Sequence, residues 1–227
     1  MKAPSIVKAS LAAAATGLFV LSGAGAASAD ATITIPSSHI DIAEIVCALD
    51  GNGNPEYEVG THIEYGGIGD VPNGTSVLSD YLFQYDQSNS SGYLSAPGAF
   101  FGNWVASGSS AAEDYIPVIG FHYEPDSALC AQTVTIDVQN VSGSASVGFV
   151  SNAPDAGMLG NGSTSTTNSN AVTLGNPLTG SLYAEHVHGT WTFAGLATGQ
   201  TYPLKFVVSI PGEGTTTLST AYFRVQP

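Results

Sequence analysis

Apolar and polar residues alternate with a period of two along much of the chain, and this pattern constrains the fold more than any other feature. Successive side chains of a β-strand point to opposite faces of a sheet, so such alternation predicts strands with one buried face. Three segments show it most clearly, at 132–139, 203–210 and 221–225. We find no convincing stretch with the 3.6-residue period of an amphipathic helix. The sequence therefore predicts an all-β protein.

Clusters of turn-forming residues separate the alternating runs. Asp, Asn, Gly and Pro gather at 50–55, 71–74 and 211–214, where they favour tight turns. The first cluster also has the Asp-x-Asn-x-Asn spacing that opens a calcium loop, but Pro55 stands where such a loop needs glycine, so we interpret it as a hairpin turn. The polar segment 160–170 is interpreted as a long exposed loop. About ten short strands with this punctuation predict a β-sandwich, Ig-like or jelly-roll-like.

The first 29 residues have the three parts of a secretory signal peptide. A positively charged start precedes an apolar run at 11–21, and Ala27-Ser28-Ala29 supplies a small-residue cleavage site. The apolar run is shorter than the roughly 20 residues that span a bilayer. We expect residues 1–29 to be removed, which leaves 30–227 as a single β-sandwich domain without an integral membrane segment. With no anchoring pattern at either end, we expect a secreted protein.

The charge of the chain argues against one class of partner. The whole chain has four Lys and Arg residues against 18 Asp and Glu residues, and the expected cleavage would remove Lys2 and Lys8. The remaining cations would be Lys205 and Arg224. Together with the 18 acidic residues they give a formal net charge of −16. A surface with two cations does not hold a polyanion electrostatically, so we expect no nucleic-acid partner. Metal cations suit this field better.

The chain has two cysteines, Cys47 and Cys130. Two thiols in an exported domain more often pair than stay free. Zinc-thiolate sites usually contain closely spaced Cys-x-x-Cys pairs, which this chain lacks. We therefore predict a disulfide between Cys47 and Cys130.

All five histidines lie in pairs with the pattern His-x-(Asp/Glu/His), namely His39–Asp41, His62–Glu64, His122–Glu124 and His186–His188. Residues i and i+2 of a strand project from the same face, so each pair would present two ligands side by side. Imidazole and carboxylate groups suit zinc and other borderline divalent ions, and two pairs on neighbouring strands would supply four ligands. A polar strand face with ordinary solvated histidines has the same pattern, so both interpretations fit.

A more specific pattern occurs at 186–193, which has the sequence His-Val-His-Gly-Thr-Trp-Thr-Phe and is followed by Gly195, Gly199 and Tyr202. It resembles the H-x-H-x-x-W-x-F…G-x-Y signature of actinobacterial surface-anchored domains of the choice-of-anchor M type. Some of these are encoded beside metal-type ABC transporters. The segment 38–41 is similar to that family's opening G-H-x-D motif, with serine in place of the glycine. The wall or membrane anchor of the family is missing, which again favours a freely secreted product.

The resemblance implies a β-rich extracellular module, associated with the cell wall, that receives or relays a substrate such as a metal ion. Its partner would be that ion, or a surface protein or transporter component. Carried over to this chain, the resemblance implies one set of metal ligands: His39, Asp41, His186 and His188. As a second choice we retain the residues of the other two histidine pairs: His62, Glu64, His122 and Glu124. Zinc suits the first set.

We therefore expect a secreted or cell-surface binding module that captures or relays a divalent metal such as zinc. We do not expect an enzyme, because the chain lacks the Gly-x-Ser-x-Gly elbow of serine hydrolases and the His-Glu-x-x-His motif of zinc proteases. The alternative function is that of a structural or adhesive surface protein without a metal site.

Overall fold

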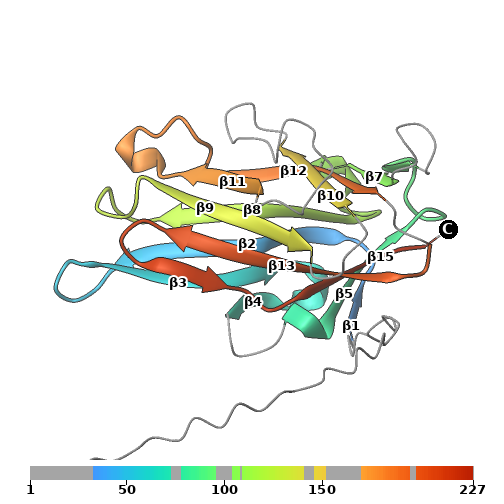
Figure 1. Cartoon of the computed structure of the whole chain (residues 1–227), viewed down its shortest axis with the longest axis horizontal. Helices are drawn as coiled ribbons and strands as arrows, with labels where there is room; N and C mark the ends of the chain where they lie inside the picture. Colours follow the sequence, from blue (N-terminus) through green and yellow to red (C-terminus); the bar gives the residue numbers. More distant parts are fainter. Residues whose placement is uncertain are drawn as a thin grey trace, which may run out of the picture.

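Two β-sheets of seven and eight strands pack together in the computed structural model (Figure 1). The structure describes residues 33–72, 78–95, 104–107, 109–140, 146–151, 170–194 and 198–226. The expected all-β sandwich is confirmed, with more strands than the expected ten or so. The additional strands are mainly short ones of two to four residues, such as β6 and β14, in which alternation is too brief to detect. The expected signal peptide and the polar segment up to residue 169 lie outside the described residues.

The eight-stranded sheet has the order β4-β3-β2-β8-β12-β7-β6, and β10 also pairs with β12. Its strands are β2 (Ser38–Leu49), β3 (Pro55–Ile63), β4 (Gly69–Pro72), β6 (Leu94–Ser95), β7 (Trp104–Ala106), β8 (Pro117–Pro125), β10 (Ser146–Ser151) and β12 (His186–Ala194). Most neighbours run antiparallel, but β2 and β8 run parallel. Strand β8 is central in this sheet and separates β2 from β12.

The seven-stranded sheet has the order β1-β5-β15-β13-β9-β11, and β14 pairs with β13. Its strands are β1 (Ile33–Ile35), β5 (Tyr81–Asp86), β9 (Thr133–Asn140), β11 (Asn170–Gly175), β13 (Thr201–Ile210), β14 (Gly214–Thr217) and β15 (Ala221–Gln226). Here β5 runs parallel to both β1 and β15. In this sheet β9, β13 and β15 correspond to the three segments whose alternation is clearest.

Short 3₁₀ helices complete the regular structure of the described part: η1 (Tyr65–Gly67), η2 (Leu78–Asp80), η3 (Ser110–Ala112) and η5 (Pro177–Thr179). No helix in that part is long and apolar enough to cross a membrane.

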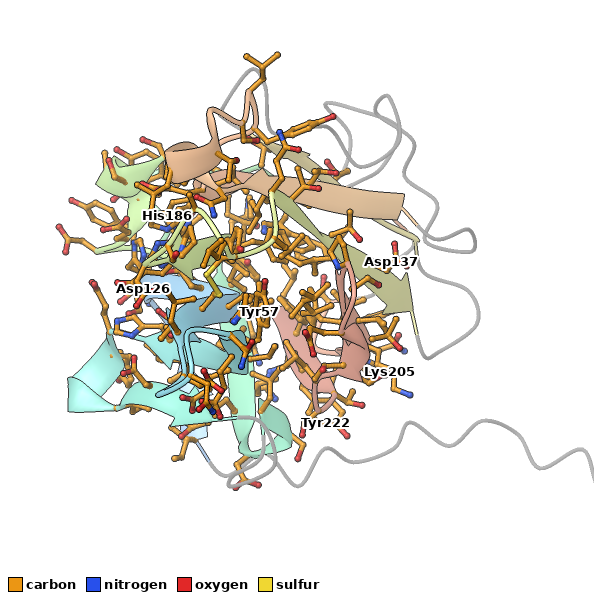
Figure 2. All side chains as sticks on the ribbon, turned by 90° about the vertical axis from the view of Figure 1, so that its left-hand side faces the viewer. Tyr57, Asp126, Asp137, His186, Lys205 and Tyr222 are labelled. Atoms are coloured by element: carbon orange, nitrogen blue, oxygen red, sulfur yellow. A yellow bond between two sulfur atoms is a disulfide. The ribbon has the colours of Figure 1, made fainter. Side chains whose placement is uncertain are left out.

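The core lies between the two sheets and is built from one face of each alternating strand. In β13, for example, the buried positions are Leu204, Phe206, Val208 and Ile210, as the pattern predicts. The outer faces carry the polar residues. Figure 2 shows His186 on one side of the molecule and Asp137, Lys205 and Tyr222 on the other.

Two of the predicted turns are confirmed and one is corrected. The residues at 50–55 connect β2 to β3, and Asp50 accepts hydrogen bonds of 2.8 Å from the backbone N–H groups of Asn52 and Asn54. Those bonds occupy the Asp50 carboxylate within a hairpin turn. The cluster at 211–214 connects β13 to β14. The turn predicted at 71–74 is wrong for Val71 and Pro72, because these two residues end β4 and pair with β3. Asn73 and Gly74 lie outside the described residues.

A disulfide joins Cys47 to Cys130 and confirms the predicted bond. Cys47 lies in β2 of the eight-stranded sheet, and Cys130 shortly precedes β9 of the seven-stranded sheet. The two Cα atoms are 6.2 Å apart and the residues are 83 positions apart in sequence. The bond therefore closes a long loop and ties β2 to the segment that leads from β8 of one sheet to β9 of the other.

Candidate metal centre

All five histidines project from the outer face of the eight-stranded sheet. Each has a fully or almost fully buried neighbour in its own strand, and these neighbours point into the core: Ile40, Ile63, Phe121 and Val187. Because side chains alternate across a strand, burying these residues forces the imidazoles to the other face. The core thus determines which surface carries the histidines.

A β-bulge in β2 adds a further carboxylate to this face. The register of β2 with both β3 and β8 shifts just after Asp41, and Ile42 and Ala43 are both buried. An extra residue in a strand reverses the alternation beyond it. As a result Glu44 faces outward like His39 and Asp41, whereas unbroken alternation would direct it into the core.

Gly120 allows the side chains of β2 and β12 to meet above β8. Asp41 of β2 and His188 of β12 are both cross-strand partners of Gly120. A Cβ atom at this position would lie 2.7 Å from Nδ1 and Cε1 of His188 and 2.5 Å from the Val187 carbonyl oxygen. The Nδ1 atom of His188 is buried and has no hydrogen-bond partner among the described residues. Close packing over Gly120, and not a hydrogen bond at Nδ1, therefore positions this ring.

The four first-choice residues converge at one point, which we call the four-ligand centre: His39, Asp41, His186 and His188. Each offers a ligand atom, and these atoms all lie within 4.8 Å of one another. The two pairs were expected on neighbouring strands. They lie instead on strands that flank β8. Figure 2 shows His186 on the surface where they meet.

The spacing of the ligand atoms is close to that of a tetrahedral zinc site. Nε2 of His186 lies 2.9 Å from Oδ1 of Asp41 and 3.0 Å from Nε2 of His188. Nε2 of His188 lies 3.4 Å from the same Asp41 oxygen, and Nε2 of His39 lies 3.3 Å from Oδ2 of Asp41. Ligands about 2.0–2.1 Å from a tetrahedral zinc ion are about 3.3–3.4 Å from each other. Small movements would fit these atoms to one ion.

Asp41 is the carboxylate to which the three histidines of the centre hydrogen-bond. Burial alone would raise the pKa of its carboxyl group, but hydrogen bonds from His186, His188 and His39 together hold that pKa well below its usual range. The hydrogen bond to Asp41 in turn outweighs burial and raises the pKa of His39 to about 9. At neutral pH the centre thus contains an ionised carboxylate and a protonated His39, whose proton a metal ion would replace.

Glu113 holds His39 from the side away from Asp41. It lies just after η3, and its Oε1 accepts a hydrogen bond of 3.2 Å from Nδ1 of His39. A metal-ligating histidine commonly donates its second ring N–H to a carboxylate, which fixes the ring and makes it a stronger ligand. No sequence pattern indicates this role, because Glu113 is 74 positions from His39 and belongs to no histidine pair.

The second-choice residues do not form a site of their own. His62 hydrogen-bonds Asp70 of β4 through Nδ1, whereas Glu64 lies 3.9 Å from Nε2 of His62. Among the described residues, two further groups have ligand atoms close enough for one ion, and Glu44 belongs to both: Glu44, His122 and Glu124; and Glu44, His62 and Asp70. Glu64 belongs to neither group. The break in alternation at Ile42–Ala43 was the sequence signal that could have placed Glu44 on this face.

Comparison of the chain with protein-family models, with curated proteins and with solved structures finds no significant match. The resemblance to choice-of-anchor M domains therefore stays a prediction. Function has to be inferred from the geometry and charge of the outer sheet face.

Proposed function

We propose that the protein is an exported binding module that captures a divalent metal ion, best matched by zinc, at the four-ligand centre. The observation that carries this proposal is the convergence of three imidazole nitrogens on one buried carboxylate, from strands that are not adjacent in the sheet. Three nitrogens and one oxygen at this spacing form a ligand set that zinc binds tightly, and copper or manganese are the competing ions.

Burial supports a metal site over a solvated polar face. The side chain of Asp41 is only 4% exposed, and those of His39 and His188 are 17% and 15% exposed. His186, at 36%, is the ligand nearest to solvent. Solvated histidines on an ordinary strand face would be separated and hydrated, since there is no reason for them to gather around one carboxylate. Two Nε2 atoms at 3.0 Å, both also near Asp41, form a cluster in which a cation is the natural shared partner.

The number of protein ligands supports binding over catalysis. Structural zinc sites have four protein ligands, whereas catalytic sites keep one position open for water or substrate. The four-ligand centre would fill a tetrahedral coordination sphere by itself. The formal net charge of −16 after removal of residues 1–29 would raise the local concentration of cations at the surface, as a capture function requires.

Two observations support the exported part of the proposal. The Cys47–Cys130 disulfide suits an oxidising compartment, and residues 1–29 have the pattern of a signal peptide. The resemblance to surface-anchored domains adds the cell wall as the site of action. A surface protein or a transporter component would then be the partner that receives the ion.

Calorimetry on exported, untagged protein tests the metal site. After treatment with a chelator, the protein is titrated with zinc, manganese or copper near pH 7. We expect tight binding that is lost in the His186→Ala/His188→Ala double variant. A Thr190→Ala/Thr192→Ala variant, changed on the same face of the same strand, should bind like the wild type. If no ion binds more tightly than about 1 mM, or about −4 kcal/mol, the proposal is wrong.

A further inference from the structure

We propose that the same sheet face holds a second divalent cation, bound by Glu44, His62 and Asp70. This inference rests on the proposed function for the class of ion and extends it to a second site. The three residues come from β2, β3 and β4, which are consecutive in the sheet order. Their ligand atoms lie within 4.8 Å of one another, outside the four-ligand centre.

The pairing of the strands brings these residues together. His62 and Asp70 are direct cross-strand partners in β3 and β4, and Nδ1 of His62 donates a hydrogen bond to Oδ1 of Asp70. Glu44 reaches the pair diagonally from β2, because the β-bulge after Asp41 turns it outward. A divalent ion would replace the proton that His62 and Asp70 share, with Glu44 as the third ligand.

There is space for the water ligands of an ion beside Glu44 and Asp70, two of the three residues. A hollow of about 80 Å³ lies next to Glu44, with Asp70, Glu58 and Gly60 among the residues that line it. Gly60 is the cross-strand partner of Glu44, and its lack of a side chain keeps this place open. One water needs about 10–15 Å³ of such space, so the hollow can hold a partly hydrated ion.

The ligand set suits zinc or manganese, bound more weakly than at the four-ligand centre. One imidazole and two carboxylates leave open positions that water fills. Asp70 is 75% exposed, in contrast to the 4% of Asp41, so solvent screens its charge and its side chain loses more freedom on binding. The four-ligand centre should therefore fill first.

The group of Glu44, His122 and Glu124 is a poorer place for a second ion. The ring of His122 lies 4.6 Å from that of His186, measured between centroids. An ion bound by His122 would therefore lie close to an ion in the four-ligand centre, and two divalent cations repel each other strongly at short range. His62 and Asp70 lie on the other side of β2 from β12. His62 is the cross-strand partner of Asp41, but its ring hydrogen-bonds Asp70 of β4.

Equilibrium dialysis against zinc, at about 0.15 M salt to screen exposed charges, tests the second site. The wild type should bind two ions, one tightly and one weakly. Glu44→Gln and His62→Gln should each bind one ion, with the tight affinity within about twofold of the wild type. His122→Gln should still bind two. Glu56→Gln is the matched control, because it removes the same charge from exposed β3 surface outside both groups, and it should bind two.

Asp70→Asn is a second variant that should fold normally, because this exposed side chain can change without disturbing the core. It too should lose only the weak ion. Loss of that ion in His122→Gln but not in His62→Gln would overturn the assignment, and so would equal weakening in Glu56→Gln. A wild type that binds one ion, lost in the His186→Ala/His188→Ala variant, would refute the second site alone. A single ion lost in His62→Gln but kept in that double variant would refute the proposed function instead.

Discussion

Nε2 of His186 donates a hydrogen bond of 2.9 Å to Oδ1 of Asp41, although the two residues are 145 positions apart and strand β8 lies between their strands. Strands on either side of a third are about 9–10 Å apart. Side chains can meet over that distance when nothing projects from the strand between them. Gly120 provides this gap beside Asp41, so a residue that is not a ligand determines whether the four-ligand centre can form.

Replacing Gly120 by alanine should disable the centre. The new methyl group would lie 2.7 Å from the ring of His188, which must move away from Asp41. We expect zinc affinity to fall at least tenfold, and the free energy of unfolding to fall by about 1–3 kcal/mol, as overpacking usually costs. Calorimetry and urea unfolding measure the two effects. Gly51→Ala, in open space, is the control. Wild-type affinity in Gly120→Ala would refute this account of the centre.

Replacing Glu113 by glutamine should weaken zinc binding without removing a ligand. The amide keeps the shape of the side chain but loses the charge that orients His39 and makes it a stronger ligand. Loss of such a supporting contact typically costs 10–100-fold in metal affinity. Competition with a chromogenic zinc chelator gives the affinity. Asp114→Asn, a change of the same charge at the exposed neighbouring position, should leave it unchanged. Equal affinities of Glu113→Gln and wild type would exclude a supporting role.

Alternation along single strands identified the core, but it could not give the order of the strands. The buried faces of β9, β13 and β15 follow directly from the sequence, because burial of every second residue needs no knowledge of neighbours. Pairing depends on contacts between distant segments. Nothing in the segment 221–226 indicates that it lies parallel to β5, about 140 positions earlier. The shortest edge strands were missed because two to four residues show no period.

The residues of the candidate site also fall into those that a single strand reveals and those that depend on distant segments. His39, Asp41, His186 and His188 were found because each pair occupies positions i and i+2, a spacing visible within one strand. Gly120 and Glu113 were missed because each acts on a histidine from another part of the chain. Glu44 was hidden by the bulge, whose trace in the sequence is the pair of adjacent apolar residues that interrupts the alternation.

The Cys47–Cys130 bond should contribute substantially to stability. In the loop-closure model a cross-link over 83 positions stabilises the folded state by about 4–5 kcal/mol. A Cys47→Ala/Cys130→Ala variant should lose about that much in urea unfolding. Thiol labelling of denatured, unreduced wild type should detect no free thiol. Two reactive thiols per chain in the exported protein would contradict the disulfide.

Export should leave Asp30 as the first residue of the mature protein. Ala27-Ser28-Ala29 has the small side chains that signal peptidase requires before its cleavage site. N-terminal sequencing of protein from the culture supernatant and from the washed cell wall tests this prediction, and the ratio of the two fractions tests association with the wall. Recovery only in detergent extracts, or with Met1 retained, would contradict it.

The stability of chelator-treated protein should depend on pH through His39. Its pKa is raised to about 9 by the hydrogen bond to Asp41, from an unfolded value near 6.5. A group whose folded pKa is raised stabilises the protein fully below its unfolded pKa, and this contribution disappears as pH rises through the folded pKa. Stability should therefore fall between about pH 6.5 and 9. The full shift corresponds to about 3 kcal/mol, and partial exposure of His39 reduces the expected change to about 1–2 kcal/mol. Urea unfolding in a chelator, compared with a His39→Gln variant, measures the difference. The variant should lack this part of the slope, and parallel pH profiles for the two proteins would show that His39 is not the titrating group.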